Sequence, residues 1–177
     1  MSDHPANRRI DKITEPAFVE GLSGLELEEL RSRRDDCLAE REYLSLLRRL
    51  LQGRAEILRA EAEARETGNG APLVERLVEI LAEDEDHPVT SRGEAVRVAV
   101  PEDEMLLARR RVERLASDSG LSDPSVLSDE ALGAAIDALV AEEQRVSEAR
   151  RAVMNVLDVL QDELKRRYKD DPSLSLR

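Results

Sequence analysis

The chain has 177 residues and a formal net charge of -12, and it contains two tyrosines, one phenylalanine and no tryptophan. So few aromatic side chains argue against a large globular core, whereas 37% charged and 41% hydrophobic residues are typical of long amphipathic helices packed side by side. The negative charge argues against general binding to nucleic acid or to an anionic membrane, because both need a basic surface.

The cysteine and hydropathy patterns predict a soluble cytoplasmic protein. Cys37 is the only cysteine, so no intramolecular disulfide can form, and no Cys/His cluster has the spacing of metal ligands. Residues 1–11 lack the apolar run of a signal peptide, and no stretch of about 18 apolar residues occurs anywhere in the chain. We therefore expect neither a bound metal nor a membrane segment.

A disordered tail is predicted over residues 1–20, because charge and proline are mixed there without periodicity. A long helix is predicted over 22–66, since Ser23 and Glu26 have the spacing of a capping box and Gly68 follows the last periodic residues. Apolar residues recur on it every seven positions, which is the seam of a coiled coil. The seam consists of Leu30, Cys37, Leu44, Leu51 and Leu58, and a second apolar set consists of Tyr43, Leu47, Leu50 and Ile57.

Two short helices are predicted in the segment that follows, an amphipathic one over 73–84 and a further one over 102–117. Residues 89–101 between them are interpreted as an extended linker. Their alternating apolar pattern would suit a strand, but a lone strand has no partner to pair with.

A second long helix is predicted over 129–168, with Ser128 as its N-cap and residues 169–177 as a C-terminal tail. Its length matches that of the first long helix, which indicates that the two pair, and the connection is long enough to return the chain for antiparallel packing. The predicted fold is therefore all-α. It is a long antiparallel helical hairpin, a coiled coil, with short helices in the connecting segment, and residues 21–168 form a single helical domain.

A polar pattern occurs once on each long helix, beside the apolar seam. Its residues are spaced by three and four positions, and such steps return to one side of a helix. In an antiparallel pair we expect Ser45 to lie opposite the end of the second copy that carries Asp158. The first copy is Ser45, Arg48, Gln52 and Glu56, and the second is Glu143, Ser147, Arg150, Met154 and Asp158.

These residue types suit a guanine nucleotide. The arginine fork matches phosphate oxygens or the O6 and N7 acceptors of guanine, and a carboxylate can accept from the N1–H and N2–H donors. The alternative is a structural or adaptor coiled coil, because the same residue types occupy the solvated flanks of any arginine-rich coiled coil.

The two copies resemble the signature of the RsiG family of cyclic di-GMP-dependent anti-sigma factors, Glu-x3-Ser-x2-Arg-x3-Gln-x3-Asp on both helices of an antiparallel coiled coil. Each copy departs from this signature in places. The first copy matches at Ser45, Arg48 and Gln52, with Arg41 in place of the first Glu and Glu56 in place of the final Asp. The second copy matches at Glu143, Ser147, Arg150 and Asp158, with Met154 in place of Gln.

The resemblance implies that two cyclic di-GMP molecules bind as an intercalated dimer along one face of the coiled coil. It also implies that the loaded protein sequesters a WhiG-type sporulation sigma factor and so blocks transcription, with the second messenger as part of the interface. The implied ligand set is Ser45, Arg48, Gln52, Glu56, Glu143, Ser147, Arg150 and Asp158.

A regulator of this kind is not an enzyme, and the sequence contains no Gly-rich phosphate loop, nucleophile elbow or paired-carboxylate cleft. Two alternatives stay open beside it, a coiled coil without a nucleotide ligand and a homodimeric four-helix arrangement in the absence of the partner. The second apolar set either covers the short middle helices or faces the sigma factor.

Overall fold

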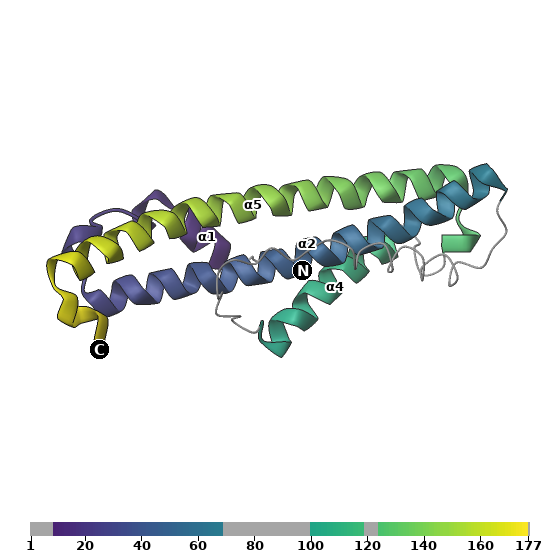
Figure 1. The fold of residues 1–177 in the computed structure, drawn as a ribbon. Helices are drawn as coiled ribbons and strands as arrows, with labels where there is room; N and C mark the ends of the chain where they lie inside the picture. The colour runs from purple at the N-terminus through teal and green to yellow at the C-terminus, as the bar shows by residue number, and fades with distance from the viewer. Residues whose placement is uncertain (1–8, 69–99, 119–123, 177) are drawn as a thin grey trace, which may run out of the picture. The chain divides into compact units, whose positions relative to one another are not determined.

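The computed structural model describes residues 9–68, 100–118 and 124–176 (Figure 1). Every regular element among these residues is a helix, which confirms the predicted all-α hairpin. The helix predicted over 73–84 and most of the predicted linker lie outside the described residues.

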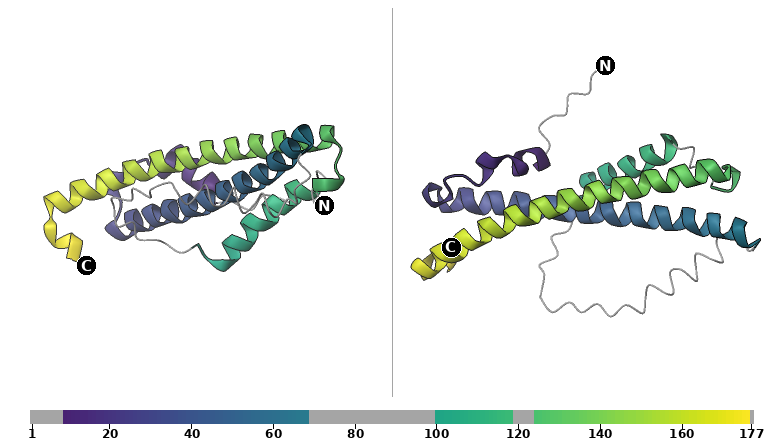
Figure 2. Two further views of the ribbon diagram at one scale, coloured as in Figure 1. Left: turned by 45° about the vertical axis from the view of Figure 1, so that its right-hand side comes forward. Right: turned by 90° about the horizontal axis from the view of Figure 1, so that it is seen from above.

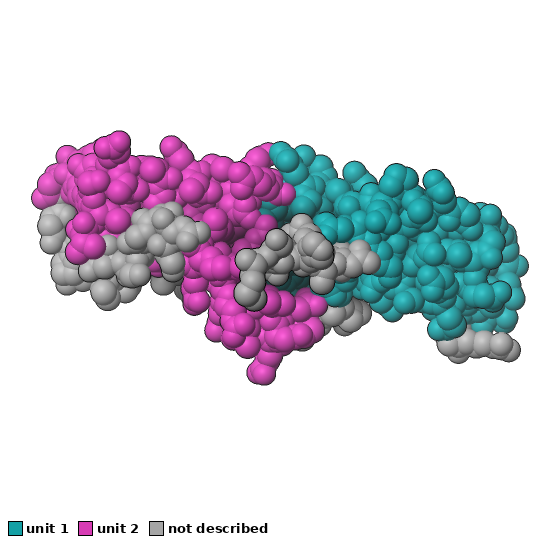
Figure 3. Space-filling model, turned by 180° about the vertical axis from the view of Figure 1, so that it is seen from behind, with its two compact units in different colours: residues 1–45, 98–100, 146–177 teal, residues 46–97, 101–145 magenta. Residues whose placement is uncertain are grey.

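The chain divides into two compact units, coloured separately in Figure 3. Unit 1 comprises residues 1–45, 98–100 and 146–177, and unit 2 comprises residues 46–97 and 101–145. Both long helices, α2 (Leu27–Thr67, 41 residues) and α5 (Asp129–Asp170, 42 residues), pass through both units. The prediction of one domain over 21–168 therefore stays a prediction.

In unit 1, the first part of α2 lies antiparallel to the last part of α5 (Figures 1 and 2). Arg31 near the start of α2 hydrogen-bonds Tyr168, while Ser45, farther along α2, hydrogen-bonds Arg150. The buried core between the helices includes the first three residues of the predicted seam. The buried apolar residues of this unit are Ile13, Phe18, Leu22, Leu30, Cys37, Leu44, Val146, Val153, Leu157, Leu160 and Leu164.

The prediction of a disordered tail over residues 1–20 is wrong for its second half. Residues Arg9–Thr14 form α1 and Pro16–Phe18 form the 3-10 helix η1. The buried side chains of Ile13 and Phe18 hold this segment, and Arg33 donates a hydrogen bond to the carbonyl oxygen of Phe18 at 2.7 Å. Two apolar residues are too few to produce a periodic signal, but they suffice to pack one short helix against a formed hairpin.

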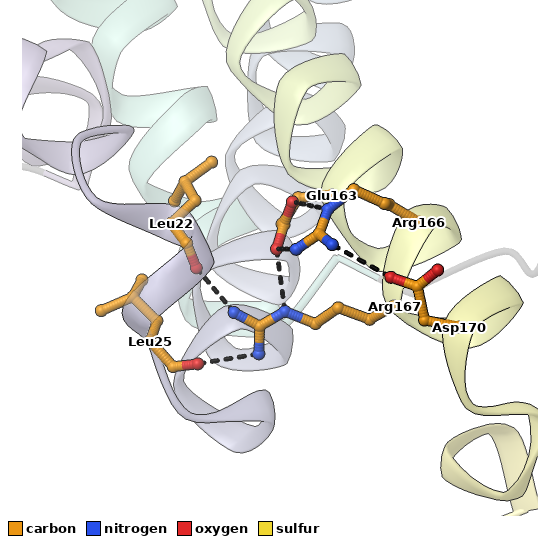
Figure 4. A network of polar contacts seen from close by, with 6 residues as sticks. All are labelled: Leu22, Leu25, Glu163, Arg166, Arg167 and Asp170. Atoms are coloured by element: carbon orange, nitrogen blue, oxygen red, sulfur yellow. Dashed lines mark hydrogen bonds and ion pairs between the residues drawn. The ribbon is translucent and has the colours of Figure 1, made fainter.

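The predicted start of the first long helix is also wrong, because α2 begins at Leu27 and Ser23 lies in the 3-10 helix η2 (Leu22–Gly24). Leu25, between η2 and α2, has an extended backbone with a ψ of 148°, which separates the two helices. A contact from the far end of the chain holds this segment, as Figure 4 shows. Arg167 donates to the carbonyl oxygens of Leu25 and Leu22 at 2.7 and 2.6 Å.

The C-terminal tail predicted over 169–177 is partly ordered as well. Helix α5 ends at Asp170, two residues beyond its predicted end, and Pro172–Leu176 form the 3-10 helix η5. Arg31 donates to the carbonyl oxygen of Leu174 at 2.7 Å, which anchors this segment to α2.

In unit 2, the last part of α2 lies antiparallel to the first part of α5, and α4 (Glu102–Asp118) packs beside them. Helix α4 confirms the short helix predicted over 102–117. Ala108 at its centre is fully buried. The buried apolar residues of this unit are Leu47, Leu51, Ala55, Leu58, Ala60, Ala108, Leu132, Ala135 and Leu139.

The ends of the long helices in unit 2 follow the predicted signals. Helix α2 stops at Thr67, and Gly68 has a positive φ of 65°, the left-handed conformation that glycine adopts after a helix. Helix α5 begins at Asp129, and the hydroxyl oxygen of Ser128 accepts a hydrogen bond from the backbone N–H of Ala131 at 3.2 Å. Arg65 closes this end by donating to the carbonyl oxygen of Pro124 in the 3-10 helix η4 (Pro124–Val126).

Candidate functional site

In unit 1, the serine of the first copy touches the arginine of the second copy. Arg150 Nε donates to Ser45 Oγ at 2.9 Å, and Ser45 Oγ donates in turn to the backbone carbonyl oxygen of Arg41 at 2.7 Å. The hydroxyl group thus uses its single proton toward the backbone and a lone pair toward Arg150. This pair of hydrogen bonds fixes the arginine against the neighbouring helix.

In unit 2, the arginine and glutamine of the first copy meet the glutamate that begins the second copy. Arg48 Nε donates to Glu143 Oε1 at 2.7 Å, and Gln52 Nε2 donates to the same oxygen at 3.3 Å. The Arg48 side chain is 42% exposed and that of Glu143 is 21% exposed. A ligand arriving from solvent can therefore reach both groups.

The departure of the first copy at Arg41 explains why the two arginines have different partners. A glutamate would stand at position 41 in the family signature, but Arg41 is itself a cation and pairs with its neighbour Glu42 at 2.6 Å. Among the described residues, Arg150 therefore contacts a neutral hydroxyl and no carboxylate, whereas Arg48 is neutralised by Glu143. The more available positive charge belongs to the second copy.

The remaining predicted residues differ in how far they are exposed to solvent. Glu56 and Asp158 are exposed carboxylates, Ser147 is half-buried, and the Met154 side chain that replaces the signature glutamine is exposed. The expected position of Ser45 opposite the Asp158 end is wrong. Ser45 meets Arg150, which lies about two helical turns earlier on α5.

Sequence reasoning missed a buried glutamate that directly precedes the first position of each copy. In unit 1, Glu40 is 5% exposed and accepts a hydrogen bond from Arg9 of α1 at 2.8 Å. In unit 2, Glu142 is 6% exposed and accepts from Arg111 of α4. A carboxylate before each copy is visible in the sequence, but its burial depends on a short helix whose docking the sequence does not reveal.

The charge of Glu142 is secured by two arginines. Burial by itself would raise the pKa of Glu142, but hydrogen bonds from Arg145 and Arg111 outweigh it and hold the pKa below its ordinary value. Arg145 Nη1 lies 2.7 Å from the second carboxylate oxygen. Glu142 therefore stays ionised at neutral pH and fastens α4 to α5.

These features define an all-α protein whose paired helices carry two copies of one polar motif, with residues of the two copies in contact inside each unit. A family model described as RsiG-like matches residues 16–81 and 118–176, which is most of the chain. The chain belongs to the RsiG-like family. Membership indicates an anti-sigma factor role with a sigma factor as partner.

A comparison with curated proteins finds no match. Within the described part of the chain, no helix has the length and apolar character needed to cross a membrane.

Proposed function

We propose that this chain is a cytoplasmic anti-sigma factor that binds cyclic di-GMP through the two motif copies. When loaded, it sequesters a WhiG-type sporulation sigma factor and blocks transcription. The observation that carries the proposal is the direct contact between residues of the two copies, Arg150 with Ser45 in unit 1 and Arg48 with Glu143 in unit 2. Such contacts bring arginine, hydroxyl and carboxylate groups together, the set that a guanine nucleotide requires.

Each unit contains an arginine, a carboxylate and a serine or glutamine of the proposed ligand set. An arginine can bind a phosphate or the Hoogsteen edge of guanine, a carboxylate can accept from its N1–H and N2–H groups, and a serine or glutamine can add a short-range hydrogen bond. Unit 1 holds Ser45, Ser147, Arg150 and Asp158, and unit 2 holds Arg48, Gln52, Glu56 and Glu143. Two such sets of residues, one in each unit, agree with the two cyclic di-GMP molecules that we propose.

The energies favour replacement of the existing contacts by the nucleotide. A partly exposed ion pair such as Arg48 with Glu143 contributes only about 0–1 kcal/mol, because water competes with Glu143 for the 42% exposed Arg48 side chain. A phosphodiester can accept two parallel hydrogen bonds from one arginine fork, and this bidentate geometry adds to the energy of a single charge-assisted hydrogen bond. The free chain therefore holds its arginines in place without binding them so tightly that a phosphate could not displace the partner.

The nucleotide in this proposal forms part of the surface that captures the sigma factor. Linkage then requires that the sigma factor tighten nucleotide binding by the same factor by which the nucleotide tightens sigma binding. Neither the nucleotide nor the sigma factor would then bind the chain with full affinity in the absence of the other.

An adaptor coiled coil without a nucleotide ligand is the second candidate. The ion pair between Arg48 and Glu143 favours it, because these two side chains already satisfy each other across the helix pair. In that case the motif would only fix the register of the helices.

Three alanine variants separate the two functions. We expect Arg48→Ala and Arg150→Ala each to abolish nucleotide-dependent capture of the sigma factor, with helix content by circular dichroism nearly unchanged. The matched control is Arg151→Ala, because Arg151 is exposed and lies next to Arg150 but outside the motif. Capture that stays nucleotide-dependent in both motif variants, measured by fluorescence anisotropy with labelled sigma factor, would show that the site is wrong.

A further inference from the structure

A groove in unit 2 lies between α2 and α4, outside the proposed nucleotide residues. Its cavity volume is about 350 Å³, and its apolar lining comes from Leu50 and Ile57 on α2 and from Val112 on α4. Leu50 and Ile57 belong to the second apolar set of this long helix. They face this groove and are only half-buried, so α4 does not fully cover them.

Arginines surround the groove. Arg49 and Arg54 line it from α2 and Arg109 lines it from α4, with Glu113 as the single acidic residue of the lining. Three cations against one anion is an unusual balance for a chain with a formal net charge of -12. The groove is therefore a local basic site on an acidic protein.

A second hollow, on α4, is also lined by arginines and an apolar side chain. It is lined by Leu107, Arg110, Glu113 and Arg114, and it shares Glu113 with the groove. Leu107 is 54% exposed, so a large apolar side chain faces solvent in a hollow that two arginines also line. We call the groove and this hollow together the α2–α4 surface.

Helix α4 is held firmly enough to present such a surface. Ala108 is completely buried, and Arg111 reaches the buried carboxylate of Glu142 on α5. The arginines Arg109, Arg110 and Arg114, in contrast, are exposed. One side of α4 therefore anchors it, while cationic and apolar side chains remain available on the other side.

We propose that the α2–α4 surface seats an acidic amphipathic helix of the sigma factor. The inference rests on the proposed function for the identity of the partner, and it adds a contact that does not involve the nucleotide. An apolar groove between two helices receives apolar side chains spaced three and four residues apart on a helix. The surrounding arginines then pair with carboxylates that flank this apolar stripe, and such charge complementarity fixes orientation and accelerates association.

Charge reversal tests the proposal. Arg109→Glu and Arg114→Glu each change one exposed arginine of the surface, and Arg59→Glu changes an exposed arginine of α2 that does not line it. At saturating cyclic di-GMP, we expect both surface variants to capture the sigma factor at least tenfold more weakly than the wild-type chain. The control is expected to change capture less than twofold.

Nucleotide binding provides the independent readout. Calorimetry with cyclic di-GMP alone is expected to give the same affinity for the wild-type chain and for all three variants, because none of them changes a motif residue. Circular dichroism is expected to show unchanged helix content, since the substituted side chains are exposed. A loss confined to sigma capture supports the proposal.

Three results would overturn it. Equal capture by all variants would show that the surface does not contact the sigma factor, although the proposed function would survive. A wild-type chain that captures no sigma factor would refute the proposed function and this inference together. Wild-type dimers that dissociate in Arg109→Glu and Arg114→Glu, observed by sedimentation equilibrium, would assign the surface to a contact between two copies of the chain.

Discussion

The two motif arginines start from different contacts, and this difference predicts their relative importance. In the proposed function, Arg48 must give up a carboxylate before it binds a phosphate, whereas Arg150 gives up only the neutral hydroxyl of Ser45. More of the free energy of the new phosphate contact therefore contributes to binding affinity at Arg150 than at Arg48.

We expect Arg150→Ala to weaken cyclic di-GMP binding by at least tenfold, consistent with the roughly 1.5–3 kcal/mol of a charge-assisted hydrogen bond. Arg48→Ala should weaken it less. Isothermal titration calorimetry of both variants and of the Arg151→Ala control measures the comparison. An equal or larger loss in Arg48→Ala would contradict the argument.

Glu163 in unit 1 predicts a pH dependence of stability. Hydrogen bonds from Arg166 and Arg167 lower the pKa of Glu163 to about 2, whereas its ordinary value is 4.5 (Figure 4). Because the folded-state pKa is depressed, the stabilisation is fully present above pH 4.5 and is lost as the pH falls toward 2.

We expect Glu163→Gln to melt at a lower temperature than the wild-type chain at pH 7, with the difference shrinking steadily between pH 4.5 and pH 2. Thermal unfolding followed by circular dichroism measures both curves. The exposed pair of Lys165 with Asp162 offers a control, because Asp162→Asn should produce a much smaller difference. A melting difference that does not depend on pH would contradict the assignment.

At the scale of elements, α1 and α4 are fastened by equivalent contacts. An arginine of the short helix reaches a buried glutamate directly before a motif copy, Arg9 to Glu40 in unit 1 and Arg111 to Glu142 in unit 2. Each short helix thus packs next to the start of a motif copy.

We expect Glu142→Gln to loosen α4, because the amide cannot neutralise Arg111 and Arg145 as the carboxylate does. Both arginines are partly exposed and can be rehydrated, so we expect a loss of only about 1–3 kcal/mol in the free energy of unfolding. Denaturant titration measures this loss. Hydrogen exchange measured by mass spectrometry should be faster in residues 102–118 and unchanged in α1, and slow exchange in α4 would contradict the role of Glu142.

Most elements could be predicted from the sequence because their signals are local. The heptad residues are buried as expected, Ser128 caps α5, and Gly68 follows α2. The segments that were missed depend on distant contacts. Helix α1 needs the formed hairpin beneath Ile13, and the segment before α2 is held by Arg167, far away in the sequence.

The motif positions could also be read from spacing, whereas their contacts could not. Helical periodicity places Ser45 and Arg48 on one side of a helix, but only the register of the helix pair decides that Ser45 meets Arg150 and that Arg48 meets Glu143. The buried glutamates were missed for a related reason. Charged residues are rarely buried unless paired, and the partners Arg9 and Arg111 stand on helices whose docking is a tertiary property.

At the scale of the whole molecule, the proposed function requires an acidic chain to bind an anionic nucleotide and then a protein. The formal net charge of -12 opposes the first step, so the motif arginines have to supply local positive charge. A sigma factor that makes further contacts with the bound nucleotide offsets this electrostatic cost of nucleotide binding. Cooperative binding of the nucleotide and the sigma factor is therefore the central claim of the proposed mechanism.

Calorimetric titration of cyclic di-GMP into the chain, with and without an equimolar WhiG-type sigma factor, tests this claim most directly. We expect saturable binding of two nucleotides per chain that becomes at least tenfold tighter when the sigma factor is present. Arg150→Ala should remove that gain. Absence of nucleotide binding under both conditions, or an affinity that the sigma factor leaves unchanged, would contradict the account.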